Sequence, residues 1–295
     1  MSRTCAICGK KTRLYSRADF DVEKLGSFGF ASRKVPEYMH YELWECPKCR
    51  YLMAENTLDT AELSSRYKQA EFDSGQEARL AARAYMQYLK KYCPGYPKGR
   101  AMDIGTGEGS YLKYLLRGGV KQVVGIEPSK APVEAADKKI RKYIVNDVFR
   151  ASDFEKGSFD MISCFQTVEH IPDPAKLLQG TRVLLKNGGI LYLVCHDYRS
   201  LVNRMLGKKS PIYDIEHLQL FSQKSIRRLA EKEGFGEIQI FTLKNRYPVK
   251  YWLRLFPLPG GIKRWILKRA EKSWWGQIQV EINVGNIGMI AVKKG

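Results

Sequence analysis

Two pairs of cysteines near the amino terminus have the spacing of metal ligands. Cys5 and Cys8 are separated by two residues, and so are Cys46 and Cys49. Each pair can present two thiolates from one turn, and four sulfurs complete the tetrahedral shell of a structural Zn²⁺. The long spacer between the pairs is compatible with this, because doubling a loop adds only about 0.6 kcal/mol to its closure. The sequence therefore predicts a zinc ribbon over residues 1–60, with no coordination position left for catalysis.

Other residues of the same types are interpreted as packing residues. His40 could replace one of the four cysteines as a ligand, but a surface or packing role is the simpler interpretation. Cys93, Cys164 and Cys195 lie at a linker and on two predicted strands, where a reduced cysteine behaves as a small hydrophobic residue. The competing interpretation of the array, four unrelated thiols, predicts no bound metal.

A glycine-rich loop with neighbouring acids forms a second candidate site. Asp103 ends a short apolar run and precedes Gly105, Gly107 and Gly109, after which a helix is expected. Closely spaced glycines let a ligand approach the backbone where a Cβ would collide with it. Glu127 ends a second apolar run, where a carboxylate can accept both hydrogen bonds from a ribose diol. The pattern therefore indicates a site for a ribose-containing cofactor.

This loop resembles that of the class I S-adenosylmethionine (SAM)-dependent methyltransferases, in which an acid precedes GxGxG. The resemblance covers about residues 61–243 and the final strand. It implies that Asp103 and the loop hold the methionine part of SAM, Glu127 the ribose, and Asp147 with Val148 the adenine. The loop residues concerned are Gly105, Thr106, Gly107 and Gly109. The alternatives are the loop of a nicotinamide-dependent dehydrogenase and a packing turn that binds nothing.

Three of the four histidines are expected at or beyond the carboxyl ends of strands, where ligands of such sheets bind. His170 follows Gln166 after the fourth strand, His196 follows the fifth, and His217 precedes a Phe-Ser pair. These stretches resemble the subgroup that includes ubiquinone-pathway O-methyltransferases and polysaccharide-cluster members, in which they line the pocket. A hydroxyl acceptor must lose its proton, a task that suits histidine. The candidate bases are therefore His217, His196 and His170, in that order.

Gln166 is expected to orient the cofactor or the acceptor. The competing interpretation of the three histidines is that each one bonds to backbone and shapes its own loop. No Asn/Asp-Pro-Pro-aromatic motif follows the fourth predicted strand. Its absence counts against methylation of a planar base.

The elements that must position these residues alternate along the chain. Apolar runs predict buried strands at 101–104, 123–126, 143–145, 159–165 and 190–195, with helical stretches between them. Two further strands are predicted at 237–243 and 287–292. Such alternation indicates βαβ units and a mostly parallel sheet. We therefore predict an α/β fold with a seven-stranded, doubly wound methyltransferase sheet.

Three units are predicted in order. Residues 61–95 form a helical linker after the ribbon, and residues 96–295 form the SAM-binding methyltransferase domain. Within that domain, residues 244–285 are expected to form a helical, basic insert before the last strand, because methyltransferases of this fold usually join these strands by a short hairpin.

The positive charge is concentrated in this insert and the final strand. The chain carries 50 Lys plus Arg against 31 Asp plus Glu, a formal net charge of +19, and residues 241–295 account for +9 of it. Four of the five tryptophans lie in the same region. Basic residues favour anionic headgroups and tryptophan favours an interface with water. Residues 248–275 are therefore expected to make peripheral contact with an anionic membrane; the alternatives are nucleic-acid binding, and a lid or dimer surface.

These features together predict a SAM-dependent methyltransferase with a structural Zn²⁺. Its acceptor is expected to be a hydroxyl, or less favourably a carbon, of a small molecule, a sugar or a lipid-linked glycan. The alternatives are a zinc-ribbon RNA methyltransferase and a non-catalytic SAM-binding scaffold. No apolar run approaches the roughly 18 residues that span a membrane, and the first residues do not resemble an export signal. We therefore expect a cytoplasmic protein, peripheral at the inner membrane face if the insert binds lipid.

Overall fold

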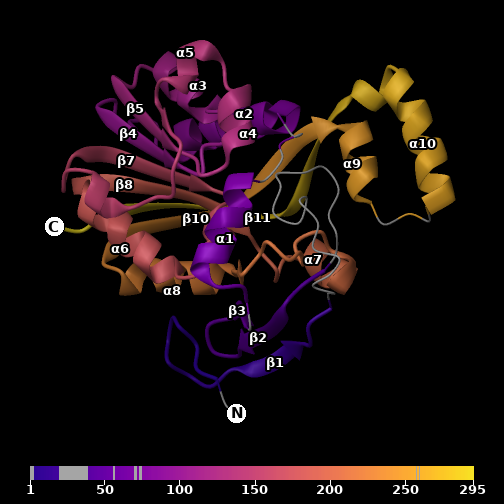
Figure 1. Ribbon diagram of the computed structural model, residues 1–295, viewed down its shortest axis with the longest axis horizontal. Coiled ribbons are helices and arrows are strands. Elements are labelled where there is room, and N and C mark those ends of the chain that lie inside the picture. Colours follow the sequence, from indigo (N-terminus) through magenta and orange to yellow (C-terminus); the bar gives the residue numbers. More distant parts are fainter. Residues whose placement is uncertain are drawn as a thin grey trace.

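A seven-stranded sheet with the order β10-β11-β8-β7-β4-β5-β6 forms the centre of the computed structural model (Figure 1). The structure describes residues 3–19, 39–55, 57–69, 72, 75–256, 258 and 260–295. The strands of this sheet are β4 (Arg100–Ile104), β5 (Gln122–Ile126), β6 (Ile144–Val145), β7 (Phe159–Phe165), β8 (Leu185–His196), β10 (Phe235–Pro248) and β11 (Gln279–Lys293). All seven predicted strands are present, which confirms the predicted methyltransferase sheet.

Six of the strands point in the same direction, and only β11 runs antiparallel to them. β4 pairs with β5 and β7, β5 with β6, and β7 with β8, all in parallel register. β11 inserts antiparallel between β8 and β10. Parallel strands that are covered on both faces read as continuous apolar runs, which is why these strands could be predicted from composition. Their carboxyl ends meet at one edge of the sheet.

Helices cover both faces of this sheet (Figure 1). Their bounds are α1 (Thr60–Gln69), α2 (Gly75–Tyr92), α3 (Ser110–Arg117), α4 (Lys130–Ala135), α5 (Lys138–Arg141), α6 (Pro174–Leu184), α7 (Leu201–Leu206), α8 (Gln223–Lys232), α9 (Val249–Leu255) and α10 (Gly260–Lys272). One apolar cluster joins α2 and α3 to one face, and a second joins α6 and α8 to the other. The doubly wound arrangement is thus confirmed.

A smaller antiparallel sheet contains the amino-terminal strands. Its order is β1 (Arg13–Ser16), β2 (Glu42–Cys46), β3 (Tyr51–Glu55) and β9 (Gln219–Leu220). The first three strands belong to the predicted ribbon, whereas β9 comes from the chain segment just after His217. Residues 20–38 of the predicted 1–60 unit lie outside the described part of the chain. The ribbon sheet is therefore completed by a strand from the methyltransferase region.

The basic insert is a helical hairpin carried on two long strands. β10 and β11 remain paired as far as Pro248 and Gln279, well beyond the strands predicted from apolar runs. The helical part is correspondingly shorter than the predicted 244–285, because the ends of that segment extend the ladder. α9 and α10 project beyond the edge of the main sheet (Figure 1). None of the described helices is long and apolar enough to cross a bilayer.

Candidate functional site

A cavity of about 1350 Å³ opens at the carboxyl ends of the parallel strands. Its walls include the glycine loop after β4, Glu127 after β5, and the segments that follow β7 and β8. The three candidate histidines line the same cavity, although they come from three separate segments. Ligands of doubly wound sheets bind at this edge. The cavity therefore brings the predicted cofactor loop and the predicted acceptor residues together.

The glycine loop has the backbone conformation that requires glycine. Gly105, Gly107 and Gly109 have φ angles of +74°, +56° and +73°, which side chains with a Cβ rarely adopt. A Cβ on Gly105 would lie 2.1 Å from Thr167 Oγ1, whereas a Cβ on Gly107 would have no neighbour within 4 Å. The loop is thus packed closely from behind at Gly105 and open at Gly107, where a ligand can reach its backbone.

Asp103 holds this loop from inside the protein. Its Oδ2 accepts a hydrogen bond from Thr106 Oγ1 at 2.8 Å, and its Oδ1 accepts one from Ser163 Oγ at 2.6 Å. Burial raises the pKa of Asp103 to about 7, and the two hydroxyl donors oppose this rise. Asp103 lines the cavity, but it also fixes Thr106 and joins β4 to β7.

Glu127 lies against the opposite side of the loop. Its two carboxylate oxygens accept hydrogen bonds from the backbone N–H groups of Gly107 at 2.9 Å and Ser129 at 2.8 Å. Burial raises the pKa of Glu127, and these N–H donors partly offset the rise. The carboxylate therefore sits beside the open part of the loop, at the position where the ribose of a cofactor is expected.

The two residues predicted to hold adenine are placed differently. Val148 lines the cavity. The Asp147 carboxylate accepts hydrogen bonds from Arg150 at 2.9 Å and from the Val148 N–H at 2.8 Å. The Arg150 hydrogen bond lowers the pKa of Asp147. Val148 thus lies with the other residues predicted to bind the cofactor, while Asp147 pairs with Arg150, and the contact of Asp147 with adenine stays a prediction.

Gln166 is held in an unusual conformation at the centre of the cavity. Its φ angle is +49°, a left-handed value that is rare outside glycine. Its Oε1 is buried and has no hydrogen-bond partner among the described residues. Strained backbone and unpaired buried polar atoms both concentrate at functional sites. Gln166 therefore has a buried acceptor atom facing no described donor, and its role in orienting the cofactor or the acceptor stays a prediction.

The three histidines form one cluster. The ring centroids of His170 and His217 lie 4.9 Å apart, and those of His196 and His217 lie 5.1 Å apart. Burial lowers the pKa of His170 and of His196 to about 4, so both rings are neutral near pH 7. A neutral imidazole has one basic nitrogen, which is the state that a proton acceptor needs.

Oxygen atoms contact the Nδ1 atom of each ring. His196 Nδ1 lies 3.0 Å from Asn286 Oδ1, and His217 Nδ1 lies 2.8 Å from the Ile212 carbonyl oxygen. Such contacts place the proton on Nδ1 and leave Nε2 as the basic atom. His170 Nδ1 lies 3.0 Å from both Tyr67 Oη and the Glu216 carbonyl oxygen. His170, Glu216 and His217 also bring ligand atoms within 4.8 Å of one another, a spacing that a divalent cation can bridge.

Several cavity residues carry no sequence motif and were not predicted. Buried polar atoms without a partner among the described residues also belong to Glu77, Asn245 and Asn286. Tyr247, Tyr251 and Trp252 add aromatic surface from the base of the insert. These residues come from α2, β10, β11 and α9, and only the packing of those elements places them in the cavity. Their positions could not be found from local spacing.

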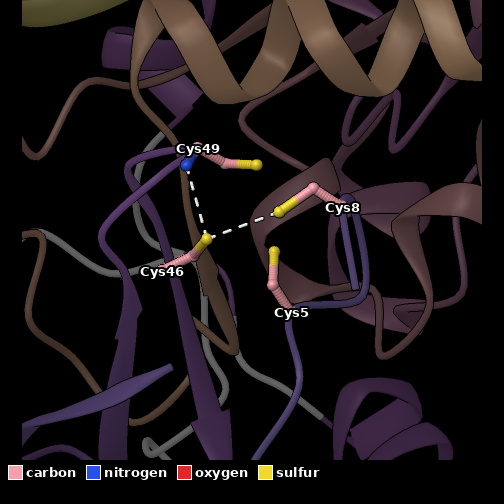
Figure 2. Close-up of side chains that lie close together, drawn as sticks. All are labelled: Cys5, Cys8, Cys46 and Cys49. Atoms are coloured by element: carbon pink, nitrogen blue, oxygen red, sulfur yellow. Dashed lines mark hydrogen bonds between the residues drawn. The ribbon is translucent and has the colours of Figure 1, made fainter. Parts of the chain in front are cut away.

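The four predicted metal ligands meet at one point of the ribbon (Figure 2). Their sulfur atoms lie within 4.8 Å of one another, and Cys8 Sγ is 3.6 Å from Cys46 Sγ. Two turns present them, closed by hydrogen bonds from Gly9 N to the Cys5 oxygen and from Arg50 N to the Cys46 oxygen, both at 2.8 Å. Four sulfurs at this separation fit one tetrahedral zinc ion.

Comparisons with known proteins agree with this arrangement. Residues 75–240 match the family model described as a methyltransferase domain. The ubiquinone biosynthesis O-methyltransferase of Actinobacillus pleuropneumoniae is 28% identical over 131 residues, which cover 41% of this chain and 53% of that protein. The corresponding enzyme of Acinetobacter baylyi is 26% identical over 126 residues, covering 40% and 50%. The chain thus spans about half the length of the curated relatives it matches.

Two solved structures share the fold. The YcgJ protein of Bacillus subtilis has a TM-score of 0.53 and 16% identity, covering 72% of this chain and 99% of that one. Phosphoethanolamine N-methyltransferase 2 of Haemonchus contortus, solved with S-adenosyl-L-methionine, has a TM-score of 0.51 and 17% identity. It covers 83% of this chain and 62% of that one. At such identities the likeness concerns the fold alone.

Proposed function

Because this chain belongs to the class I SAM-dependent methyltransferases, we propose that it transfers the methyl group of SAM to a hydroxyl, or less favourably to a carbon, of an acceptor in the same cavity. The observation that carries the proposal is the meeting of the glycine loop and the histidine cluster in one cavity. SAM supplies an already activated methyl group. The chain must therefore bind both molecules, align them and remove the acceptor's proton.

The cofactor side of the cavity fits SAM. The open space over Gly107, the Glu127 carboxylate beside it and the unpartnered Gln166 Oε1 form a cradle with acceptors for hydroxyl and ammonium groups. Asp103 holds Thr106 and so maintains the shape of the loop. Val148 supplies an apolar wall for the adenine, and we retain Asp147 as a neighbour of that ring.

His217 and His196 are proposed as the proton acceptors. Both have Nδ1 in contact with an oxygen, so Nε2 is the atom that would take the proton from an acceptor hydroxyl. His170 contacts Tyr67 and the Glu216 carbonyl through Nδ1 and packs against His217, a placement that suits an orienting role. This retains the predicted order of His217, His196 and His170.

The acceptor is proposed to carry both hydroxyl groups and apolar surface, as a small molecule, a sugar or a lipid-linked glycan does. Polar atoms of Glu77, Asn245 and Asn286 that have no partner in the described part of the chain can pair with hydroxyl groups. Tyr251, Trp252 and other residues of α9 extend the cavity with apolar and aromatic surface. The cavity volume exceeds that of most single-ligand pockets, as expected where cofactor and acceptor bind together.

We also propose that Cys5, Cys8, Cys46 and Cys49 bind a structural Zn²⁺. Their spacing and geometry support this role, and four sulfur ligands leave no open position for a catalytic water. Zinc binds the thiolate form of cysteine, so binding at this site is expected to release protons and to depend on pH.

Residues 248–275 are proposed to touch an anionic membrane. Ile262, Trp265 and Trp274 are 54%, 59% and 80% exposed, which is unusual for large apolar side chains. Basic residues lie among them, namely Lys263, Arg264, Lys268, Arg269 and Lys272. Phe256 is both exposed and part of the cavity wall, so this surface is continuous with the proposed acceptor site. Under this proposal the protein acts in the cytoplasm, at the inner membrane face.

Flotation with vesicles tests the membrane proposal. The intact chain should bind vesicles that contain phosphatidylglycerol and should not bind vesicles of phosphatidylcholine alone. Changing Trp265 and Trp274 to Ser should abolish binding, whereas Leu14→Ser, at an exposed site on the ribbon, should not. If the chain does not bind vesicles and binds RNA with an affinity that falls steeply with salt, the RNA methyltransferase alternative replaces the membrane proposal.

Titration with SAM tests the core of the proposal. The wild type should bind SAM, and Gly107→Arg should abolish binding because the new side chain fills the cradle. Gly119→Arg is a matched control, since Gly119 also has positive φ and open space but lies outside the cavity. Labelled methyl transfer from SAM into a host lysate, fractionated into lipid, RNA and small molecules, then identifies the acceptor class. SAM binding with no transfer into any fraction would favour a non-catalytic scaffold.

A further inference from the structure

The ribbon and the segment that carries His217 share one sheet. β3 of the ribbon pairs antiparallel with β9, with Leu52 opposite Leu220 and Met53 opposite Gln219. The Ala54 N–H donates to the Leu218 oxygen at 2.8 Å and continues this pairing toward His217. The histidine is therefore followed immediately by residues that are hydrogen-bonded to the ribbon.

Side chains reinforce this contact next to the metal-binding cysteines. The Tyr51 hydroxyl donates to Gln219 Oε1. Ser222 Oγ donates to the Arg50 carbonyl oxygen at 2.7 Å, directly after Cys49. Arg50 itself has a φ angle of +57°, which is uncommon for a residue with a side chain. The end of the His217 segment therefore contacts the same turn that presents Cys49.

A buried carboxylate attaches the segment after His196 to the ribbon. Glu45, on β2 beside Cys46, is 1% exposed. Its Oε1 accepts a hydrogen bond from the Tyr198 hydroxyl at 3.0 Å and lies 3.7 Å from Arg199 Nη1. Its Oε2 accepts from Arg13 Nε at 3.0 Å. A buried carboxylate with this many donors fixes the positions of all of them.

The two histidine segments are also joined to each other. Tyr198 N–H donates to the Phe221 carbonyl oxygen at 3.1 Å, and Phe221 packs on Tyr51 with ring centroids 5.4 Å apart. By contrast, the glycine loop packs on Thr167 after β7, and Asp103 before the loop accepts a hydrogen bond from Ser163 of β7, so neither contact involves the ribbon. The cofactor and acceptor sides of the cavity therefore have different supports.

We propose that the zinc ribbon supports the acceptor site from outside the cavity, and that its residues Glu45 and Tyr51 are positioning residues that hold the His196 and His217 segments. Zinc binding then sets the geometry of the acceptor side and leaves the SAM side unaffected. This inference rests on the proposed function, because it assigns those histidines to the acceptor. Without zinc, the four thiols no longer hold the two turns together, and the Arg50 turn relaxes from its left-handed conformation.

Hydrogen exchange of the whole chain, with and without a zinc chelator, tests the metal dependence. Removal of zinc should raise exchange at least tenfold in residues 196–203 and 212–222, with little change in 101–110 and 122–128. The dissociation constant for SAM should change by less than about twofold. Equal change in all four regions, or no change in the first two, would overturn the inference. If the protein binds SAM neither with nor without zinc, the proposed function is contradicted. The exchange result would still test whether zinc stabilises the His196 and His217 segments.

Conservative variants test the positioning role itself. Tyr51→Phe removes the hydroxyl that donates to Gln219, and Tyr192→Phe, a matched control, removes a buried hydroxyl that donates to the Tyr85 oxygen. The chain has four histidines, so imidazole NMR resonances can be assigned singly. Tyr51→Phe should shift the His217 resonance and Tyr192→Phe should not, even where both lower the melting temperature. An unmoved His217 resonance in Tyr51→Phe and in Glu45→Gln would refute the role.

Discussion

The backbone N–H of His196 donates to Glu169 Oε1 at 2.7 Å, which joins the end of β8 to the loop after β7. Glu169 is fully buried beside the histidine cluster, and its Oε2 has no hydrogen-bond partner among the described residues. Burial raises the pKa of Glu169 to about 8, so this carboxyl is neutral at pH 7. Under the proposed mechanism, a neutral acid here keeps negative charge away from the acceptor hydroxyl that loses its proton.

Glu169→Gln is expected to change how stability depends on pH. In the wild type, Glu169 keeps its proton in the folded state from about pH 4.5 to 8 while the unfolded state loses it. The free energy of unfolding therefore falls with rising pH, by at most about 1.4 kcal/mol per unit from this group. Gln mimics the neutral acid, so the variant should gain stability relative to wild type as pH rises. Urea unfolding from pH 5 to 8 measures this.

The control is Glu155→Gln, which removes one carboxylate at an exposed position. It shows the effect of removing one surface carboxylate over the same pH range. If the difference in unfolding free energy between Glu169→Gln and wild type does not change with pH, Glu169 is ionised in the folded protein.

The imidazole rings of His170 and His196 should titrate near pH 4. Burial lowers both pKa values from the ordinary 6.5, because the charged form is poorly solvated. The unfolded chain therefore takes up these protons first, and their contribution to stability is lost as pH falls from about 6.5 to 4. NMR titration of the ring protons measures the midpoints. Midpoints above 6 would mean that these rings are accessible to water.

Replacing His217 or His196 with Gln should lower methyl transfer by about 10²- to 10⁴-fold, the usual contribution of a general base. SAM affinity should remain within about twofold of wild type, since neither ring supports the glycine loop. Labelled methyl incorporation into the identified acceptor and SAM titration measure the two effects. Glu155→Gln, at an exposed position outside the cavity, is the control. If both cavity variants keep full activity, His217 and His196 do not act as bases and only shape the loops that carry them.

Gly105→Ala should weaken SAM binding by tenfold or more. A Cβ at Gly105 would collide with Thr167 Oγ1 at 2.1 Å, and Thr167 Cβ at 2.9 Å leaves no rotamer that removes the conflict, so the loop must move. Gly119→Ala is the matched control, because Gly119 has a φ of +89° and nothing within 4 Å of its added Cβ. Calorimetric titration with SAM compares the two. Equal affinities would show that the loop tolerates the shift.

Metal analysis of the purified chain should find one zinc per molecule. Cys46→Ser should remove most of it, because three thiolates bind zinc far more weakly than four. Cys93→Ser, which changes a half-buried thiol outside the cluster, should leave the zinc content unchanged. Mass spectrometry of the intact protein under native conditions gives the count. Wild-type protein without zinc, purified in the absence of chelators, would support four unrelated thiols.

The cofactor side could be predicted from the sequence because its signals are local. Asp103, the glycines and Glu127 all sit at the ends of apolar strands, and each strand places its last residue at the same edge of the sheet. The cysteine pairs are equally local, since each pair occupies one turn. In both cases spacing along the chain determines spacing in the structure.

The acceptor side could be predicted only in part. The histidines stand at strand ends, but their partners Tyr67, Asn286 and Glu169 become neighbours only when separate elements pack. β9 has two residues, too few to show any alternation of apolar and polar side chains. The pairing of Asp147 with Arg150 depends on side-chain conformation, which spacing does not specify.

The late position of β9 in the chain has a consequence for synthesis of the protein. The ribbon strand β3 ends at Glu55, whereas its partner begins at Gln219. At translation rates of about 5–20 residues per second, β3 waits on the order of ten to thirty seconds for that partner. During this interval its outer edge is open to pairing with other nascent chains. The newborn protein therefore carries an unpaired edge on β3 until residues 219–220 have been synthesised.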